Sequence, residues 1–486
     1  MSKRIGRRNV VAALAAGAAV VAFDPVNRTW ITAARATTSG IHIPNLDGEL
    51  VVDAASRAEA ADDYGHIIHR TPVAVLRPGS VRDIVTLVRF ANQHGIVIAM
   101  RGQGHSMYGQ AQAGGGVVID SRTLNAIDIG TDRAIVGAGV RWIDLLQASL
   151  AHGLTPPILT DLIDLSIGGT LSVGGIGGHT HRVGLQIDNV IELEVVTGEG
   201  HLRTCSQAHH ADLFESVLGG LGQFAIIVKA TIPLAPAKTH ARVFKLFYSD
   251  LGTYLSDQRK ASADERFDYL EGEILPAQTG GGWMFMLEAA AYYTPPESPD
   301  SAALLAGLSP NGGVTIEEQS YFDWQNRLAP LIEALKQSGL WLFPHPLVDL
   351  FLPDSQVERF VASALAQLDP ADTANSPMLF YPFKRSKLKR PFLEVPNEET
   401  LFLFDILRTV PPDPAAVRAT LDVNRALFEQ ARNLGGKRYA ISAVEFSQQD
   451  WREHFGRDFF LFALRKAQFD PKKVLAPGQG IFAPAP

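Results

Sequence analysis

Arg-Gly-Gln-Gly-His-Ser, at residues 101–106, is the segment from which the fold and function of this sequence are most readily inferred. Residues 96–100 before it are apolar throughout, which predicts a buried strand that ends in a tight loop. The two glycines let main-chain N–H groups approach a phosphate or a flat ring closely. His105 is then a candidate ligand, base or cofactor attachment point, or else an ordinary loop histidine, and the segment alone leaves these alternatives open.

The residues before this loop predict alternating strands and helices. Residues 73–76 and 96–100 are expected strands, and residues 81–94 between them have the spacing of a helix with one apolar face. Ser80 is a suitable N-cap for this helix, and Gly95 is a suitable C-terminal stop. The pattern therefore predicts a β-α-β unit whose second strand leads into the glycine loop.

The same alternation continues after the loop. Strands are expected at residues 117–120, 134–136, 190–197, 201–205 and 225–228, and helices at residues 142–152 and 212–218. The two strands that flank Gly198-Glu199-Gly200 are expected to form a hairpin. Pro233 and Pro236 mark a boundary, because the chain beyond them has longer helices, more aromatic residues and few glycine loops.

A second glycine-rich segment covers residues 166–178 and has six glycines among thirteen residues. Glycine is a poor helix former, so we expect this segment not to form a stable helix interior but to bring its backbone close to a ligand. It does not match the Rossmann fingerprint, because no strand-turn-helix context with a following acidic residue fits. It does not match a P-loop either, because no Gly-Lys-Ser/Thr occurs.

The composition limits the class of protein. The chain has 486 residues, enough for two or three domains, and its 46% hydrophobic and 20% charged residues allow a large core. A net charge of −7 without a basic stripe argues against nucleic acid as a partner. Cys205 is the only cysteine, which excludes an internal disulfide and a thiolate zinc site.

The N-terminus has the pattern of an export signal. Four basic side chains come first: Lys3, Arg4, Arg7 and Arg8. The apolar run at 10–23 is 14 residues long, shorter than the ~20 that a membrane-spanning helix needs, and Ala34-Arg35-Ala36 offers a cleavage site. The paired arginines favour twin-arginine export, with a Sec signal or an uncleaved anchor as alternatives.

Removal of this signal changes the charge of the chain. Residues 1–36 hold six Lys or Arg and one Asp, so their removal leaves 38 basic and 50 acidic residues and a net charge of −12. We therefore expect an acidic, soluble protein that is exported to the periplasm or outside the cell and is not associated with a membrane.

Several further segments occur in a familiar order over about residues 70 to 482. They are Gly168-Gly-Thr-Leu-Ser172, Asp188-Asn-Val190, Asp212-Leu-Phe214, Leu218-Gly-Gly-Leu-Gly-Gln-Phe224, Pro344-His-Pro346, Asp450-Trp451, Asp470-Pro-Lys-Lys473 and Pro477-Gly-Gln479. Together with residues 101–106 they resemble the FAD-linked oxidoreductases of the vanillyl-alcohol oxidase type, also called the PCMH type. Within that superfamily the chain is most similar to cytokinin dehydrogenases.

The resemblance implies an α+β fold. Residues 45–237 would form the first part of a PCMH-type FAD-binding domain with two subdomains, and residues 437–486 would return to complete it. Residues 238–436 would form a substrate-binding domain with an antiparallel sheet covered by helices. Residues 1–36 would remain outside this fold as the export signal.

The resemblance also implies that FAD binds across the first domain, with its ring at the junction between domains. His105 matches the position that bonds covalently to the 8α-methyl group of the flavin. A second link through a cysteine, which related enzymes have, is not expected, because Cys205 lies in a strand segment of its own. The other residues that match cofactor contacts are Met100, Gly102, Gln103, Gly104, Ser106, Gln110, Asp161, Ser166, Ser172, Ile176, Ile227, Tyr439 and Gln479.

Two carboxylates match catalytic positions of the family. Asp161 matches the catalytic aspartate, which accepts the N–H of an amine during its oxidation; the alternatives are its neighbour Asp164 and a purely structural turn aspartate. Glu271 matches the glutamate that positions the substrate at the rim of the pocket, and the alternative is an exposed strand carboxylate. Glu273 lies two residues further on and would share its strand face.

Three histidine pairs are candidates for metal ligands, but we expect no metal site. The pairs are His66 with His69, His179 with His181, and His209 with His210. They lack carboxylate or cysteine partners at ligand spacing, so we expect structural roles. His345 in the Pro-His-Pro turn is expected to pack or to line a pocket.

The resemblance implies oxidation of N6-isoprenoid adenines, with oxygen or a quinone as electron acceptor. The amine would become an imine, which water splits into adenine and an aldehyde. Leu159 and Leu162 stand where plant members have an aromatic residue and a tyrosine, and both positions flank the substrate. Two alternatives therefore stay open: a covalent-flavin enzyme for a sugar, alditol or other alcohol, and a secreted flavin-binding protein without turnover.

Overall fold

The computed structural model describes residues 45–277, 282–373 and 376–482, together with the backbone of three N-terminal strands. These strands form a small antiparallel sheet and are β1 (Val20–Asp24), β2 (Thr29–Thr32) and β3 (Ile41–His42). Residues 1–19, with the basic head and part of the apolar run, lie outside the described residues. Over the described part of the chain, every helix is too short or too polar to cross a membrane.

The glycine loop leaves a four-stranded sheet with the order β4-β5-β7-β6. Its strands are β4 (Glu49–Val51), β5 (Ala74–Arg77), β6 (Ile98–Arg101) and β7 (Val117–Asp120), and helix α2 (Ala54–Ala60) follows the first of them. Strands β5 and β6 both pair in parallel with β7, which lies between them. The strands of the predicted β-α-β unit, β5 and β6, are therefore parallel as expected. They are not direct neighbours, because β7 lies between them.

Helix α3 (Val81–His94) has the limits that its sequence predicts, and Gly95 ends it in the left-handed conformation at φ 66°. The side chains of the expected apolar face are buried: Ile84, Leu87, Val88 and Ala91. Full burial of a large aliphatic side chain stabilises a fold by about 1.5–3 kcal/mol, so the burial of this face stabilises the packing of α3.

A five-stranded antiparallel sheet with the order β12-β11-β13-β9-β8 forms the second subdomain. Its strands are β8 (Ile127–Ile129), β9 (Arg133–Gly137), β11 (Glu192–Thr197), β12 (Leu202–Ser206) and β13 (Ala225–Pro233). Helices α4 (Trp142–Leu150) and α7 (Ala211–Val217) and the short pair β10 (Leu154–Thr155) and β14 (Ala235–Pro236) accompany it. The hairpin of β11 and β12 is confirmed.

The glycine-rich segment at 166–178 contains a helix, α5 (Ile167–Val173), so the expectation that it would not form one was wrong. Tertiary packing outweighs the low helix propensity of glycine here. A Cβ on Gly168 would lie 2.8 Å from the Cβ of Ala138, so a larger residue would hold the helix away from the five-stranded sheet. Gly174 and Gly175, at φ 154° and 74°, then end the helix.

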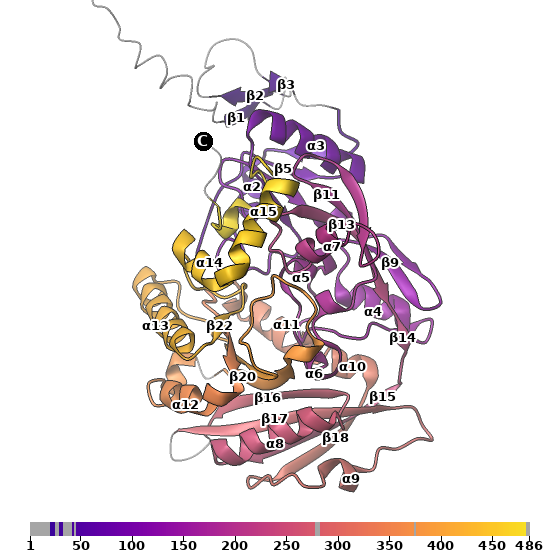
Figure 1. Cartoon of the computed structure of the whole chain (residues 1–486), viewed down its shortest axis with the longest axis vertical. Coiled ribbons are helices and arrows are strands. Elements are labelled where there is room, and N and C mark those ends of the chain that lie inside the picture. Colours follow the sequence, from indigo (N-terminus) through magenta and orange to yellow (C-terminus); the bar gives the residue numbers. More distant parts are fainter. Residues whose placement is uncertain are drawn as a thin grey trace, which may run out of the picture.

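An eight-stranded antiparallel sheet, with the order β18-β15-β17-β16-β20-β21-β19-β22, lies in the lower half of Figure 1. Its strands are β15 (His240–Tyr248), β16 (Tyr269–Pro276), β17 (Trp283–Tyr293), β18 (Val314–Ser320), β19 (Val348–Pro353), β20 (Met378–Lys384), β21 (Thr400–Ile406) and β22 (Lys437–Arg438). One face packs against α8 (Leu251–Asp264), α12 (Asp354–Leu365) and α13 (Pro414–Asn433).

Shorter helices connect these strands. They are α9 (Ser301–Leu305), α10 (Tyr321–Gln325), α11 (Ala329–Gln337) and the 3-10 turn η4 (Leu340–Leu342). Another short helix, α6 (Thr180–Val183), precedes β11 in the first half of the chain. Because side chains alternate along a strand, every second residue of β19, β20 and β21 points away from the helices and toward the first half of the chain.

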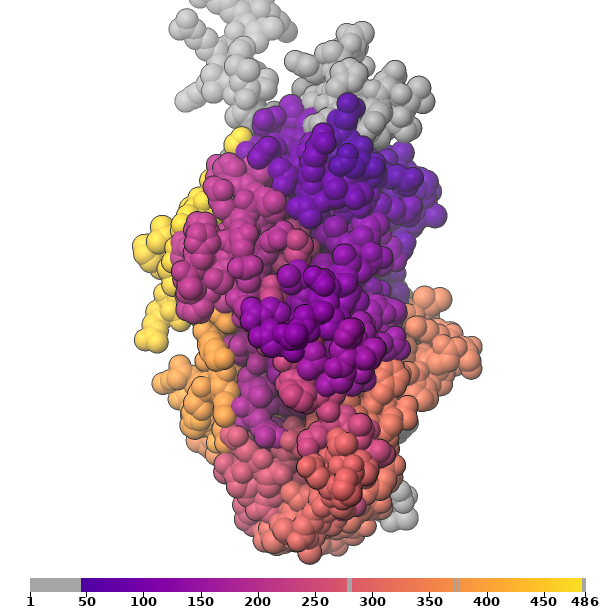
Figure 2. Space-filling view, turned by 90° about the vertical axis from the view of Figure 1, so that its right-hand side faces the viewer, coloured from indigo at the N-terminus to yellow at the C-terminus, as the bar shows by residue number. Residues whose placement is uncertain are grey.

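The C-terminal segment returns to the first half of the chain, where helices α14 (Gln448–Phe455) and α15 (Phe459–Phe469) lie in yellow beside the purple elements (Figure 1). Leu475 bridges to Ile98 of β6. Lys466 and Asp470 form a fully buried ion pair at 2.8 Å, and Asp470 also accepts the main-chain N–H groups of Val474 and Leu475. In Figure 2 the first half and the eight-stranded sheet form two stacked masses.

Candidate active site

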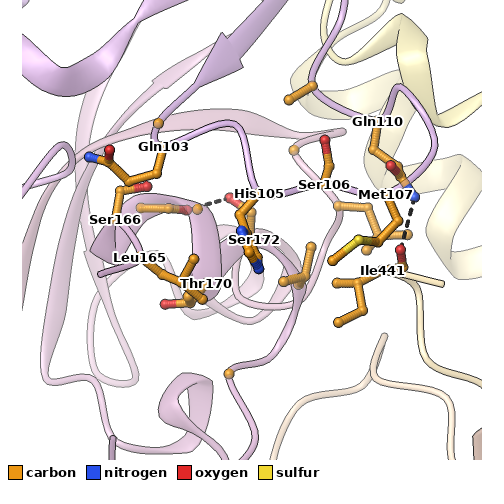
Figure 3. Close-up of a pocket in the computed structure, with 18 of the residues that line it drawn as sticks. Gln103, His105, Ser106, Met107, Gln110, Leu165, Ser166, Thr170, Ser172 and Ile441 are labelled. Carbon is orange, nitrogen blue, oxygen red and sulfur yellow. Dashed lines mark hydrogen bonds between the residues drawn. The ribbon is translucent and has the colours of Figure 1, made fainter. Parts of the chain in front are cut away.

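A cavity of about 310 Å³ lies where the glycine loop, α5, the eight-stranded sheet and the C-terminal segment meet (Figure 3). Every residue that the sequence assigned to the cofactor lines it. These residues are Met100, Gly102, Gln103, Gly104, His105, Ser106, Gln110, Asp161, Ser166, Ser172, Ile176, Ile227, Tyr439 and Gln479. Segments separated by more than 370 residues therefore converge on one site.

The two glycines of the loop are required by their surroundings. A Cβ on Gly102 would lie 1.9 Å from the hydroxyl oxygen of Ser166. Gly104 has a φ of 71°, and a Cβ there would meet the Arg101 guanidinium at 2.2 Å. Only glycine fits such close approaches, so the loop can lie flat against the entrance to α5.

His105 belongs to a stack of three aromatic rings. Its ring lies 4.1 Å from that of Tyr64, which in turn lies 4.1 Å from the ring of His345. Burial lowers the pKa of His105 to about 3, and the charge of His345 acts in the same direction, so the ring is neutral at physiological pH. His345 thus packs as expected, whereas Tyr64 carried no sequence signal for this position.

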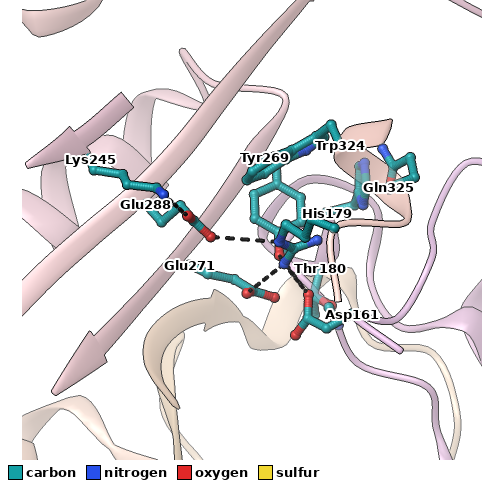
Figure 4. A network of polar contacts seen from close by, with 12 residues as sticks. Asp161, His179, Thr180, Lys245, Tyr269, Glu271, Glu288, Trp324 and Gln325 are labelled. Atoms are coloured by element: carbon teal, nitrogen blue, oxygen red, sulfur yellow. Dashed lines mark hydrogen bonds and ion pairs between the residues drawn. The ribbon is translucent and has the colours of Figure 1, made fainter. Parts of the chain in front are cut away.

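Two side chains from the second half of the chain, Tyr269 and Arg327, hold Asp161 in place (Figure 4). The hydroxyl of Tyr269 donates to Oδ1 of Asp161 at 2.6 Å, and the guanidinium of Arg327 contacts the same oxygen at 2.5 Å. Its rival Asp164 pairs instead with Arg141 at 2.6 Å, is 42% exposed and does not line the cavity. The geometry therefore favours Asp161 over Asp164 as the reactive carboxylate.

Arg327 is the centre of this network, although no pattern in the sequence indicates it. Its guanidinium also lies 3.4 Å from Glu271 and 3.7 Å from Glu288, and it covers the ring of Trp324 at 4.5 Å. Burial alone would lower the pKa of Arg327, but Tyr269 and the surrounding carboxylates hold it well above its usual value. A single arginine after a short helix has no motif that distinguishes it, so only the fold reveals its role.

Glu271 and Asp161 both contact the Arg327 guanidinium, but Glu271 is not among the residues that line the cavity, so its predicted position at the rim is not what the structure has. Glu271 is 3% exposed, which excludes the exposed strand carboxylate, and within the described structure its Oε1 has no hydrogen-bond partner. Burial, and then the charge of Asp161, raise the pKa of Glu271 well above its usual value. Glu271 also faces Glu288 on the neighbouring strand.

The late-chain residues take different positions. Tyr439 accepts the N–H of Gly175 at its hydroxyl, 2.9 Å away, which joins the C-terminal part to the end of α5. Gln479 places a buried Oε1 at the cavity, without a partner among the described residues. Cys205 of β12 is buried in the core that the five-stranded sheet shares with its helices, and burial raises the pKa of its thiol to about 12.

The remaining histidines make structural contacts. Both ring nitrogens of His181 contact main-chain oxygens, and His179 contacts the Tyr292 hydroxyl at 3.0 Å. His66 pairs with Asp62 at 2.7 Å. Across the residues that the structure describes, three or more potential metal ligands do not come together anywhere.

Comparisons with known proteins place the chain in a family. Residues 72–206 match the family model of an FAD binding domain, and residues 275–482 match that of cytokinin dehydrogenase 1, FAD and cytokinin binding. Among solved structures, 6-hydroxy-D-nicotine oxidase from Arthrobacter nicotinovorans superimposes with a TM-score of 0.70 at 20% identity, over 88% of this chain and 96% of that one. A vanillyl-alcohol-oxidase-type flavoprotein from Myceliophthora thermophila gives 0.67 at 18% identity, over 85% and 80%.

The protein thus has the fold of the vanillyl-alcohol-oxidase-type flavoproteins. Cytokinin dehydrogenase 9 from Oryza sativa subsp. japonica is 33% identical over 92% of this chain and 94% of its own length. An uncharacterized oxidoreductase of the fasciation locus of Rhodococcoides fascians is 41% identical over 89% of this chain and 99% of its own. The chain belongs to the cytokinin dehydrogenase family of FAD-linked oxidoreductases, as its sequence segments indicated.

The residues that line the cavity are suitable for binding FAD, independently of the family comparison. Close-packed glycines at residues 102–104 and 168–175 leave the backbone uncovered along one side, as an extended cofactor requires. The unpaired Gln479 Oε1 offers a hydrogen-bond acceptor, and the neutral ring of His105 lies at the wall. Such a mostly apolar cavity with a few directed polar groups is typical of cofactor sites.

Proposed function

We propose that this protein oxidises the secondary amine of N6-isoprenoid adenines. The observation that supports it most is the Asp161 carboxylate, which lines the FAD cavity and is aimed by Tyr269 and Arg327. A carboxylate in this position accepts the N–H of a bound amine and orients the adjacent C–H bond. Several relatives with a named activity, from Oryza sativa and Arabidopsis thaliana, are cytokinin dehydrogenases, which supports the same substrate class.

The reaction removes a hydride from carbon and a proton from nitrogen, and leaves an imine. FAD, when bound, supplies the two-electron acceptor, and oxygen or a quinone takes the electrons in turn. Asp161 holds the amine proton, while Arg327 and Tyr269 prevent the carboxylate from turning away. Glu271, which lies 3.4 Å from the Arg327 guanidinium, would position a ring nitrogen of the purine. Water then splits the imine into adenine and an aldehyde.

Anaerobic reduction of the purified holoprotein tests this proposal. An N6-isopentenyl adenine is expected to bleach the flavin, whereas alditols and simple alcohols are expected to leave it oxidised. Reduction by polyols but not by the amine would favour the alcohol oxidoreductase instead. Failure of every substrate would favour a flavin-binding protein without turnover.

We also propose that His105 carries FAD covalently. The ring is neutral, lines the cavity and is oriented by its stack on Tyr64, so a ring nitrogen is free to act as a nucleophile. A covalent bond would keep the cofactor in a protein that is exported, which we propose from its N-terminal pattern.

His105→Ala is expected to abolish covalent attachment, because no other cavity histidine replaces its ring. The measurement is flavin fluorescence of the protein band after denaturing electrophoresis, where the wild type is fluorescent and the variant is dark. His152→Ala, on the exposed surface, is the matched control and keeps its fluorescence. Release of all the yellow colour from acid-denatured wild-type protein would contradict the covalent link.

A further inference from the structure

Two aspartates face each other on the wall of the cavity that the eight-stranded sheet forms. Asp349 of β19 lies directly opposite Asp405 of β21 in the antiparallel register. Both line the cavity, and they are only 3% and 5% exposed. Cross-strand neighbours have their Cβ atoms about 4.5–5.5 Å apart, so the two carboxyl groups are within reach of each other.

The surrounding wall is otherwise apolar or aromatic. The other cavity-lining residues on or beside these strands are Leu347, Leu379, Tyr381, Leu403 and Leu407. Asp349 and Asp405 therefore occupy positions where the alternation of the strands would place two more apolar side chains. A buried carboxyl pair is costly unless its oxygen atoms are hydrogen-bonded, which raises the question of what it binds.

Only some of the carboxyl oxygens of Asp349 and Asp405 have hydrogen-bond partners among the described residues. The Ser442 hydroxyl donates to Oδ2 of Asp349 at 3.1 Å, whereas Oδ1 of Asp405 is buried without a hydrogen-bond partner among the described residues. The nearby guanidinium of Arg438 donates to the carbonyl oxygen of Val444 at 2.6 Å. Arg408, the other neighbouring cation, contacts the side chain of Asn424.

Burial acts on both carboxyl groups of the pair. It raises the pKa of Asp349 to about 6 and that of Asp405 well above its usual value, and the charge of Asp349 raises the pKa of Asp405 further. The Oδ1 of Asp405 is therefore a buried hydrogen-bond acceptor without a partner among the described residues. The charge of Asp161 also acts on Asp405, which indicates that both groups belong to the same electrostatic environment.

We propose that the Asp349–Asp405 pair binds a hydroxyl group on the N6 side chain of the substrate, while Asp161 binds the amine. This inference rests on the proposed function and adds a preference for hydroxylated side chains over hydrocarbon ones. One unpaired oxygen matches the single O–H donor of a hydroxyl, whereas an ammonium group would bring three donors. A pocket built to bind a hydroxyl disfavours an analogue without it, because the acceptor then stays unpaired.

The test compares two adenines whose N6 side chains differ only in a terminal hydroxyl, with kcat/KM measured for each on the holoenzyme. The wild type is expected to prefer the hydroxylated amine by about tenfold, the value of one hydrogen bond. In Asp405→Leu this ratio is expected to fall toward one. Asp405→Asn keeps a side-chain oxygen and is expected to retain most of the preference.

The thermal midpoint of each variant separates recognition from a structural role. Asp405→Leu removes a buried, unpaired oxygen and is expected to keep or raise the midpoint, whereas a structural pair would lose stability. Asp422→Leu, at an exposed helix position, is the matched control and is expected to keep the ratio of the wild type. Equal kcat/KM values in the wild type, or a ratio unaffected by Asp405→Leu, would overturn the inference while the proposed function stands. Failure of both amines to reduce the flavin would overturn both.

Discussion

Asp161→Asn is expected to slow anaerobic reduction of the flavin by an N6-isoprenoid adenine by about 10²-fold or more, in line with the usual contribution of a general base. The amide keeps the size of the side chain, but it cannot hold the amine proton as a carboxylate does. Tyr269 would still find an oxygen to donate to, so the surrounding geometry is expected to survive. The measurement is the rate of loss of flavin absorbance in stopped flow at saturating amine.

Asp164→Asn is the matched control, because Asp164 is close in sequence but pairs with Arg141 outside the cavity. Its reduction rate is expected to stay within about twofold of the wild type, since it removes no cavity contact. If Asp161→Asn reduced as fast as the wild type, Asp161 would have no part in the chemistry. If Asp164→Asn were the slow variant, the two residues would have to exchange roles.

Arg327→Leu is expected to lower the free energy of unfolding by about 3–5 kcal/mol, the usual cost of removing one partner from a buried ion pair. The substitution leaves Asp161, Glu271 and Glu288 close together without their shared cation. It also frees Asp161 to rotate, so the surviving holoprotein is expected to be reduced much more slowly. Denaturant unfolding of the holoprotein, followed by tryptophan fluorescence, measures the first effect.

The exposed pair of Arg418 and Asp422 supplies the control for this prediction. Both side chains are more than half exposed, so Arg418→Leu is expected to cost no more than about 1 kcal/mol. Equal losses in the two variants would show that the Arg327 network is no more important than a surface ion pair. Arg327→Lys keeps the charge but loses the planar fork, and an intermediate stability is expected.

Local sequence patterns determined most of the secondary structure in the first half of the chain. The limits of α3 follow from Gly95 and an apolar face of period 3.6, and these signals act within a few residues. Ser80 stands at the N-cap position, but its hydroxyl donates to Asp47 and does not cap the helix. The helix α5 was missed because its glycines are selected by packing against Ala138, which lies 30 residues earlier. Propensity describes an isolated segment, whereas contact distances between segments belong to the folded chain.

The candidate site likewise has residues that local sequence patterns predict and residues that they do not. The residues predicted to contact the cofactor belong to glycine loops and other contiguous segments with a family resemblance, and all of them line one cavity. Arg327, Tyr64 and Tyr269 were not found, because each is a single side chain without a local pattern. The roles of Arg327 and Tyr269 arise only when the second half of the chain brings them next to Asp161, and that of Tyr64 arises only when its loop stacks on His105.

The sequence by itself determined the family, the FAD cofactor and the carboxylate that we propose as the reactive group, because these depend on contiguous segments with a family resemblance. The tertiary structure decided the partners and the electrostatics of the site. The pKa of Glu271 is raised, and Asp405 keeps an unpaired oxygen, because strands distant in sequence bury them beside Asp161 and Asp349. Burial and the distance between charges are properties of the assembled fold, so the glycine loop at residues 101–106 could indicate the cofactor but not the chemistry opposite to it.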